Sequence, residues 1–374
     1  MTQASDALAG TDDLPTPQLL FYEDRIKANI AHVVALAGSP ERLRPHVKTH
    51  KTAEIARLCE AAGITRHKCA TLAEAAVLAA AGARDVLVAY PLVGPGLAGL
   101  AALRQRHAAT DFKVQVDAPD TLPALAALAQ ASGRPLTVLV DLDVGMGRTG
   151  IPPGPEALAL YQQIARTPGL TPGGLHAYDG HVTADAAASR QEATQRSLAL
   201  VQDLRSALTA AGLPVPRIVM GGSPTFPQYA AARETGLECS PGTFALHDHG
   251  YASRYRDLAG LQPAALVATR VISRPRGGRV TLDLGSKAIA SDSPAERRCA
   301  LVGLPDASIL LHSEEHLVIT GPGTERLALG DVLYAVPAHV CPTVALYREA
   351  LVVRAGRIAD RWRIAARDRD FRGP

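Results

Sequence analysis

The residues best suited to covalent chemistry lie in one basic segment, Arg-Pro-His-Val-Lys-Thr-His-Lys, at positions 44–51. Helical patterns flank this segment, so we predict that Leu43–Val47 is a short buried strand that ends just before Lys48. A lysine at the C-terminal end of a barrel strand can be desolvated and can form a Schiff base with a carbonyl compound. The same residues also suit a basic loop that binds a phosphate or an acidic partner, and the spacing alone leaves both interpretations open.

Arg148 lies in a glycine-rich turn, Asp141–Gly150, which follows the predicted strand Leu136–Leu142. The glycines let the backbone turn tightly at the mouth of a barrel, and the guanidinium group can then point at an anion or a phenolate oxygen. A single glycine-rich turn is a common feature, so this motif gains meaning only beside Lys48.

Two more glycine turns follow the last two predicted barrel strands, where barrels often hold a phosphate group. Successive backbone N–H groups in such turns form an anion-binding nest, and hydroxyl groups add donors. Neither turn has the Gly-x-x-x-x-Gly-Lys pattern of a nucleotide triphosphate loop, and each taken alone could be an ordinary turn. Their joint placement favours a phosphate, and we expect contacts from Gly221, Gly222, Ser223, Gly242 and Thr243.

The segment His176–His181 ends the sixth predicted barrel strand. Tyr178 and His181 both fall near the barrel mouth, where a general base could act. Residues 176 and 178 share one face of the strand. We interpret His176 as a packed histidine rather than a catalytic one.

His339 and Cys341 lie in a late segment, Pro337–Thr343, that we predict to be extended. Both side chains then point the same way, so the imidazole and the thiolate can bind one metal ion. A thiolate favours Zn²⁺, whereas an aspartate in its place would favour Mn²⁺ or Mg²⁺. Because two ligands alone do not make a site, a buried cysteine beside an unrelated histidine is the alternative.

Segment 44–51 resembles the cofactor-lysine segment of the D-threonine aldolase and D-serine dehydratase family. These are pyridoxal phosphate (PLP) enzymes that share the alanine-racemase-type fold, and the resemblance extends over most of the chain. It implies that Lys48 carries the cofactor and that His46, Arg148 and Tyr178 lie near it. The turn around Arg148 is similar to the family's Asp-x-Gly-x-x-Arg-x-Gly turn, and the family places the PLP phosphate on the glycine turns described above.

Two details of the resemblance point in opposite directions. The His-x-Cys pair before a proline resembles the metal dyad of the D-serine dehydratases, since the aldolases tend to carry an aspartate at the second position. After Tyr178 the chain departs from the aldolases, because Asp179 stands where they have a histidine and Ala184 where they have a further histidine. His181 is the residue that could take over as the base.

The composition limits the possible classes of protein. A chain of 374 residues with 47% hydrophobic residues can form two domains, or one barrel with an appendage. A net charge of +3 from scattered residues gives no reason to expect nucleic acid, and we find neither a membrane-spanning run nor a secretory signal. The five cysteines are far apart and odd in number, so we expect reduced thiols in a cytoplasmic protein.

Strand and helix patterns alternate along the first two thirds of the chain, and we predict a (βα)8 TIM-type barrel at residues 18–250. An open doubly wound sheet is the runner-up. We predict that residues 1–17 form an N-terminal arm and that residues 251–374 form an all-β domain that carries the metal dyad. The eight predicted barrel strands are Leu43–Val47, Lys68–Thr71, Asp85–Ala89, Phe112–Val116, Leu136–Leu142, Gly174–Tyr178, Ile218–Gly221 and Glu238–Ser240.

We therefore predict a PLP- and divalent-metal-dependent lyase that acts on D-3-hydroxy amino acids. His181 favours retro-aldol cleavage of a D-threonine-type substrate, because that route needs a base at the β-oxygen. Cys341 favours dehydration of D-serine or D-3-hydroxyaspartate to a keto acid and ammonia. An amino-acid racemase and a non-catalytic PLP-binding protein are the further alternatives, and the family resemblance implies a homodimer.

Overall fold

The computed structural model describes residues 8, 11 and 13–371, so most of the predicted N-terminal arm lies outside the described residues. The chain forms two compact units. One contains Val33–Lys48 and Ala53–Gly242 together with the C-terminal segment from Asp368, and the other contains Thr49–Thr52 and Thr243–Arg367 together with the N-terminal segment up to His32.

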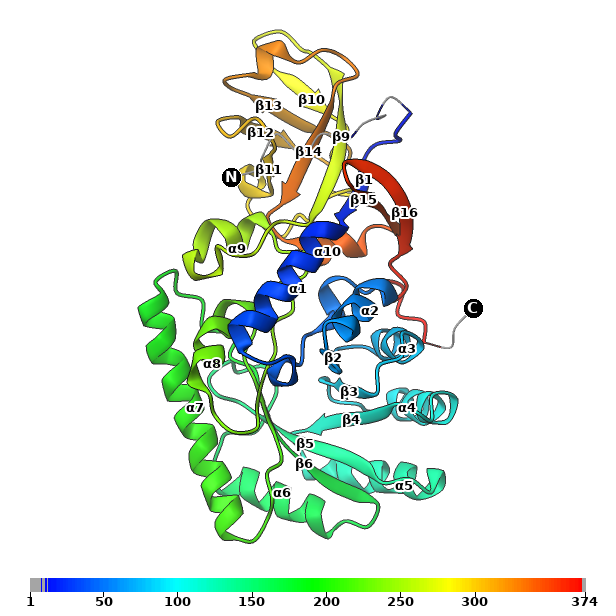
Figure 1. Cartoon of the computed structure of the whole chain (residues 1–374), viewed down its shortest axis with the longest axis vertical. Coiled ribbons are helices and arrows are strands. Elements are labelled where there is room, and N and C mark those ends of the chain that lie inside the picture. Colours follow the sequence, from blue (N-terminus) through cyan, green and yellow to red (C-terminus); the bar gives the residue numbers. More distant parts are fainter. Residues whose placement is uncertain (1–7, 9–10, 12, 372–374) are drawn as a thin grey trace. The chain divides into compact units, whose positions relative to one another are not determined.

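The first unit is built on a parallel sheet whose strands follow one another in chain order, as a barrel of βα repeats requires. Its strands are β2 (Arg66–Cys69), β3 (Asp85–Val88), β4 (Asp111–Val116), β5 (Leu136–Leu142), β6 (Leu170–Ala177), β7 (Ile218–Met220) and β8 (Leu237–Cys239). Figure 1 shows the helices of this unit along the outside of the strands. The predicted alternation is confirmed.

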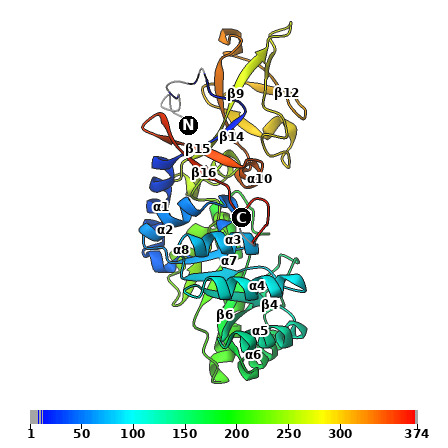
Figure 2. The ribbon, with the colours of Figure 1, turned by 90° about the vertical axis from the view of Figure 1, so that its right-hand side faces the viewer.

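Helices follow the strands of this unit and pack against them. Helix α3 packs against β2 and β3, and α6 packs against β5 and β6 (Figures 1 and 2). The α-helices of the whole chain are α1 (Glu23–Ala37), α2 (Ala53–Ala61), α3 (Leu72–Ala80), α4 (Pro95–Arg106), α5 (Leu122–Ser132), α6 (Pro155–Arg166), α7 (Ala187–Ala210), α8 (Phe226–Ala232), α9 (His249–Arg254) and α10 (Val340–Ala345). Short 3-10 turns are η2 (Pro40–Arg42), η3 (Val47–Thr49), η4 (Pro119–Thr121), η5 (Ser223–Thr225), η6 (Arg256–Leu258), η7 (Ala295–Arg297) and η8 (Thr324–Arg326).

The predicted first barrel strand, Leu43–Val47, is wrong as a regular strand. The segment forms only single parallel bridges, from Leu43 to Cys239 on β8 and from His46 to Lys68 on β2. Pro45 has no N–H group and cannot complete a ladder, although its carbonyl accepts a hydrogen bond from the N–H of Lys68 at 2.8 Å. The eighth position of the barrel is therefore filled by an irregular segment that bridges both neighbouring strands.

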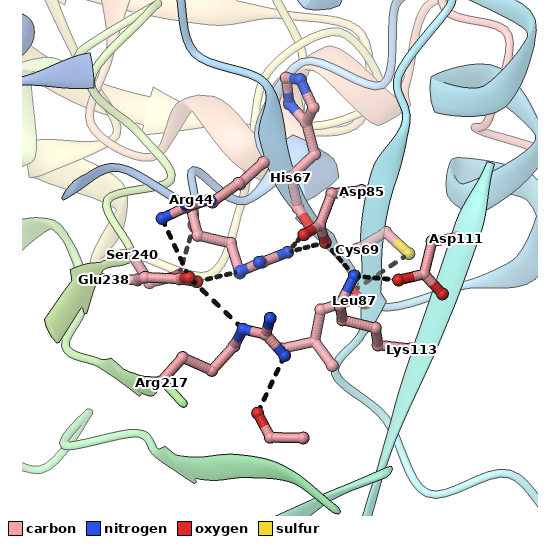
Figure 3. Close-up of polar contacts among 12 residues, drawn as sticks. Arg44, His67, Cys69, Asp85, Leu87, Asp111, Lys113, Arg217, Glu238 and Ser240 are labelled. Carbon is pink, nitrogen blue, oxygen red and sulfur yellow. Dashed lines mark hydrogen bonds and ion pairs between the residues drawn. The ribbon is translucent and has the colours of Figure 1, made fainter. Parts of the chain in front are cut away.

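A buried ion cluster holds that segment in place (Figure 3). The side chain of Arg44 is fully buried, and its guanidinium group lies 2.5 Å from Glu238 on β8 and 2.7 Å from Asp85 on β3. Lys113 on β4 adds a second cation at 2.8 Å from Asp85. The two carboxylates raise the pKa of Arg44, and the Arg44 guanidinium group is the main cause that holds the pKa of Asp85 well below its usual range.

The second unit consists mainly of strands. Its sheet runs in the order β12 (Ser308–His312), β13 (Leu317–Thr320), β10 (Val280–Leu282), β9 (Ala265–Ser273), β1 (Gln18–Tyr22), β15 (Glu349–Arg354) and β16 (Arg357–Arg363), with β14 (Val332–Pro337) on β9 and β11 (Cys299–Leu301) on β14 (Figure 2). Leu20, Leu266, Tyr334 and Leu351 belong to its buried core. Strand β1, near the N-terminus, pairs with β9 and β15 in this sheet.

All five cysteines carry free thiols, as predicted, and four of them are buried. Burial raises the pKa of Cys59 and of Cys299 to about 12, which keeps these two thiols protonated and unreactive. No helix in the part of the chain that the structure describes combines the length and the apolar surface needed to cross a bilayer.

We expect Arg44→Met to lower the free energy of unfolding by about 3–5 kcal/mol, because it leaves the buried Glu238 and the partly buried Asp85 short of a cation. Arg66→Met is the matched control, since Arg66 pairs with the same Glu238 at 3.2 Å but has a side chain that is 37% exposed. That variant should cost at most about 1 kcal/mol. Urea unfolding of both variants measures the difference, and equal small losses would contradict a clamping role for Arg44.

Candidate functional site

Lys48 lies in η3, directly after the irregular segment that closes the barrel. Its backbone N–H donates a hydrogen bond to Nδ1 of His46 at 3.2 Å, so the buried imidazole fixes the turn that presents the lysine. The Lys48 side chain itself is exposed, and its Nζ is 5.8 Å from the centre of the Tyr178 ring. The predicted cofactor lysine and Tyr178 are thus brought together.

Three basic side chains surround the Tyr178 ring, which follows β6 at the barrel mouth. Arg148 approaches to 4.9 Å and Lys68 to 6.0 Å of the ring centre, beside the amine of Lys48. Each lies at a distance at which a cation is attracted to an aromatic face. A ring with three basic groups around it suits an anionic, planar ligand.

Glycines make room around the same ring. A Cβ atom at Gly180 would lie 2.3 Å from the Tyr178 side chain, and one at Gly222 would lie 3.1 Å from it. Neither glycine could therefore be replaced without moving the tyrosine, and the ring keeps the position in which Lys48, Lys68 and Arg148 surround it.

The turns that were predicted to bind a phosphate lie close together. The hydroxyl group of Ser223 accepts a hydrogen bond from the N–H of Gly242 at 3.1 Å, and the hydroxyl group of Thr225 accepts one from the N–H of Gly222 at 3.1 Å. Gly221 has φ of 81°, and a Cβ there would meet Tyr229 at 2.7 Å, so only glycine fits. Thr243 is buried and belongs to the other compact unit.

Together, these features test whether PLP fits the unit. The amine of Lys48 suits the aldehyde of PLP, and Arg148 suits its phenolate oxygen. The turns with Gly221, Gly222, Ser223 and Gly242 suit its phosphate once the N–H groups of Gly222 and Gly242 exchange the Thr225 and Ser223 hydroxyl groups for phosphate oxygens. The residues present therefore fit the group.

A buried polar chain runs from Lys68 to Asp141. Nζ of Lys68 lies 3.4 Å from Nε2 of His176, and Nδ1 of His176 lies 2.6 Å from Oδ1 of Asp141. The other carboxylate oxygen of Asp141 accepts hydrogen bonds from Gln115 and Thr149, both at 3.0 Å. Because Asp141 accepts from Nδ1–H, Nε2 of His176 is left to accept a hydrogen bond from Lys68.

Burial, followed by the charge of Lys48, lowers the pKa of Lys68 to about 7 against the opposing effects of Asp141 and Asp179. Burial is also the main cause that lowers the pKa of His176, followed by the charge of Lys68. His176 is packed and hydrogen-bonded, in line with its interpretation from the sequence. Asp179 is buried as well, and its desolvation raises its pKa.

His181 is exposed and lies against the turn that carries Arg148. Its Nε2 would be 2.9 Å from a Cβ atom at Gly145, where φ is 123°. Asp143 organises this turn by accepting hydrogen bonds from the N–H groups of Gly145 and Gly147 at 2.9 and 3.1 Å. The structure brings His181 to this turn.

His339 and Cys341 lie close together in the second unit, but the prediction of an extended segment is wrong. His339 is the N-cap of α10, and Cys341 lies in the first turn of that helix, where Pro342 is tolerated because the first N–H groups need no helical partner. The hydroxyl group of Thr343 donates to the carbonyl of His339 at 2.8 Å and secures the helix start.

The Cys341 thiol, followed by the Asp292 carboxylate, raises the pKa of His339 to about 9. Asp292 bonds to Nδ1 of His339, which leaves Nε2 as the ring nitrogen for a metal. Within the described residues, no group of three or more His, Cys, Asp or Glu side chains could hold a metal ion. His339 and Cys341 alone would supply two of the four ligands of a tetrahedral zinc ion, one fewer than the protein supplies in most catalytic zinc sites.

A cavity of about 580 Å³ opens beside His339 within the second unit. Its lining includes Tyr251, Arg254 and Arg297 together with apolar side chains such as Leu301. Asp248 borders the cavity, and its carboxylate accepts hydrogen bonds from the N–H groups of Tyr251 and Val340 at 2.9 and 3.1 Å. Burial raises the pKa of Asp248 to about 6.

Sequence reasoning missed Lys68 and Asp292. Lys68 begins a predicted strand, and a lysine inside a parallel barrel strand is unusual enough to be a signal, since such strands are normally apolar. Asp292 is 47 residues away from His339 in the chain, and no spacing rule connects the two residues.

The comparisons with known proteins agree on the architecture. The family model "Alanine racemase, N-terminal domain" matches residues 22–245, and the model "Putative serine dehydratase domain" matches residues 264–353. The chain is 32% identical to a D-threonine aldolase from Arthrobacter sp over 98% of this chain and 95% of the relative. It is 28% identical to a D-threo-3-hydroxyaspartate dehydratase from Delftia sp. (strain HT23), over 93% of this chain and 97% of that protein.

The solved structures that resemble this chain also include an aldolase and a dehydratase. The crystal structure of D-threonine aldolase from Filomicrobium marinum matches with a TM-score of 0.87 at 28% identity and covers 96% of this chain and 97% of that chain. A cysteine-to-alanine mutant of D-threo-3-hydroxyaspartate dehydratase in the metal-free form matches with a TM-score of 0.82 at 26% identity, over 94% and 98% of the two chains.

We expect Lys68→Met to stabilise the protein most below pH 7. In the unfolded chain the lysine keeps its ordinary pKa of 10.5, whereas folding lowers it to about 7. Between these values the unfolded state binds more protons, so the stability of the wild type rises with pH by about 1.4 kcal/mol for each unit of pKa difference. The advantage of Lys68→Met should therefore shrink by several kcal/mol from about pH 7 to about pH 10.

Lys113→Met is the control for this measurement, because Lys113 is equally buried but pairs with Asp85 and Asp111. It should destabilise the protein at every pH in that range. Urea unfolding at several pH values measures both variants, and a pH-independent difference between Lys68→Met and the wild type would contradict the lowered pKa.

Proposed function

The chain belongs to the alanine racemase N-terminal domain family and to the D-threonine aldolase family within it, and from this membership we propose a PLP-dependent lyase acting on D-3-hydroxy amino acids. The proposed reaction is retro-aldol cleavage of a D-threonine-type substrate to glycine and an aldehyde. The observation that carries the proposal is the Lys48 amine, which faces Tyr178 together with Arg148 and Lys68 next to a glycine-rich phosphate nest.

PLP, when bound, supplies an electron sink for the α-carbon of an amino acid. In our proposal the Lys48 amine holds the cofactor carbonyl carbon, and His46 fixes the turn that presents this amine. Gly221, Gly222, Ser223, Gly242 and Thr243 bind the phosphate, and Arg148 and Tyr178 contact the ring. Once a substrate amine has replaced it, the free amine of Lys48 can accept a proton from the substrate.

His181 is the proposed base for the β-hydroxyl group. Its support is an exposed ring at the turn of Arg148, together with the need for a proton acceptor at the β-oxygen in retro-aldol cleavage. Tyr178 is the second candidate, because its ring lies beside the amine of Lys48.

We further propose that His339 and Cys341 hold a divalent metal, with Zn²⁺ favoured by the thiolate and Mn²⁺ or Mg²⁺ as alternatives. Such an ion supplies a Lewis acid for the substrate β-oxygen. Asp292 orients the imidazole by bonding to its Nδ1, and Thr49 lies 3.2 Å from the sulfur of Cys341. The support is the proximity of the two donors at the start of α10.

A D-serine or D-3-hydroxyaspartate dehydratase is the second candidate function, and Cys341 is the observation that favours it. In that reaction Lys48 removes the Cα proton and hydroxide leaves from Cβ, which gives a keto acid and ammonia. The relatives named above include both an aldolase and a dehydratase. The chemistry at Cβ therefore has to be decided by experiment.

We also propose a cytoplasmic homodimer that binds small-molecule D-amino acids and neither nucleic acid nor membranes. The even mix of charges, the free thiols and the family membership support this. In this proposal residues 18–250 form the cofactor domain, and residues 251–374 form the domain with the metal dyad.

We expect the purified protein to be yellow and Lys48→Ala to lose this absorbance on dialysis, because the only covalent anchor of the cofactor is gone. Absorption spectra measure this, and borohydride reduction followed by peptide mapping locates the anchor. Lys51→Ala is the matched control, since Lys51 lies three residues away and should not matter. Reduction that fixes the cofactor to Lys51 would contradict the assignment.

We expect the protein with metal to convert D-threonine to glycine and acetaldehyde, and a chelator to remove this activity. Cys341→Ala should lower turnover by orders of magnitude with unchanged cofactor absorbance, because it removes a metal ligand but not the phosphate nest. Cys299→Ala, which changes a buried thiol, is the control. Pyruvate and ammonia from D-serine as the main product would select the dehydratase, and full activity of Cys341→Ala in chelator would refute the metal role.

A further inference from the structure

Lys68 is a buried amine at the barrel mouth that the proposed reaction does not use. It is 3% exposed, and among the described residues no carboxylate lies within ion-pair distance of its Nζ. Lys113 on β4 is equally buried but has Asp85 and Asp111 at 2.8 and 2.6 Å. A buried ammonium group is costly without a carboxylate partner, so Lys68 and Lys113 are held in different states.

The charged and titratable groups around Lys68 come from every element that packs against it. They are Arg44 before η3, Lys48 in η3, Asp141 in β5, His176 in β6 and Asp179 after β6, and the Tyr178 ring faces its Nζ. Arg148 acts on this chain through His176. Two carboxylates favour a charge on Lys68, and two cations together with burial oppose it.

Because these effects oppose one another, a bound ligand can change the protonation state of Lys68. With Lys48 charged and the site empty, the opposing effects bring the pKa of Lys68 to about 7. An anionic ligand beside the Tyr178 ring would add a third negative neighbour, which raises the proton affinity of a nearby amine. The lone pair of His176 Nε2, held in place by Asp141, is ready to accept a hydrogen bond from the charged form.

We propose that Lys68 is a positioning residue whose amine is largely uncharged in the empty site and takes up one proton from solvent when PLP joins Lys48. The proposal rests on the proposed function, because it takes Lys48 as the cofactor lysine. The charged Lys68, held by His176 and Asp141, then disfavours a second charge on Lys48, since like charges nearby repel. In its charged form Lys68 donates a hydrogen bond to His176, which Asp141 holds in place, and so fixes a charged group beside the Tyr178 ring that Lys48 also faces.

The proton balance of this step is simple. The Lys48 ammonium group and the PLP aldehyde form a C=N bond with the loss of one water molecule, and the nitrogen keeps its one positive charge. The Lys68 amine gains one proton from solvent and becomes an ammonium group. No electrons are transferred. Attachment of PLP therefore takes up one proton that a chain without Lys68 would not take up.

Proton counting during PLP addition tests the proposal. Apo protein in weakly buffered solution with a pH indicator is mixed with PLP, and protons are counted for the wild type, Lys68→Met, Lys68→Arg and Lys113→Met. At about pH 8, one unit above the pKa of Lys68, the wild type should take up close to one proton more per chain than Lys68→Met. At about pH 6 the difference should fall to about a tenth of a proton, because Lys68 is already charged.

The other two variants show whether the extra proton binds to Lys68 itself or follows from a structural change elsewhere. Lys68→Arg keeps a charge at every pH and should match Lys68→Met, whereas Lys113→Met should match the wild type. Equal proton counts for the wild type and Lys68→Met at both pH values, with normal PLP absorbance, would overturn this proposal alone. Wild-type uptake in Lys68→Arg would overturn it as well. Failure of the wild type to attach PLP to Lys48 would overturn the proposed function, and this proposal with it.

Discussion

The structure of the cofactor unit depends on one buried charge, the guanidinium group of Arg44. Its partners come from opposite sides of the irregular closing segment, with Glu238 on β8 and Asp85 on β3 (Figure 3). Segment 43–46 has only single bridges to its neighbours, so main-chain hydrogen bonds alone would hold it weakly. Breaking a buried ion pair is expensive, and this cost therefore fixes the segment that precedes Lys48 by only a few residues.

Three groups of buried side chains lie inside the cofactor unit. They are the Arg44 cluster, the apolar cluster of Leu87, Leu139 and Val219, and the polar chain of His176 and Asp141. The carboxylates of the Arg44 cluster pair with cations that stabilise the fold, whereas Lys48 and Arg148 lie beside the Tyr178 ring and stay available to a ligand.

Most of the fold and the main site residues follow from local patterns in the sequence. The βα alternation, the glycine turns and the position of Lys48 are set by short-range periodicity, and these are the features that the structure confirms or brings together. The predictions that are wrong, and the residues that were missed, have other causes. Pro45 removes the ladder that would have made a regular strand, and the helix at Val340 replaces an extended segment. Partners such as Asp292 depend on contacts across dozens of residues, which periodicity cannot reveal.

Lys68 and Lys113 show how little sequence context determines the state of a buried amine. Both are the third residue of their strands, and both align in register with Leu87 on the strand between them. Lys113 reaches Asp85 and Asp111 and belongs to the cluster that stabilises the barrel. Lys68 instead reaches the neutral ring of His176 and faces Tyr178 beside Lys48. Two lysines with the same position on the strands that flank β3 therefore differ because their long side chains reach different partners, one with carboxylates and one without.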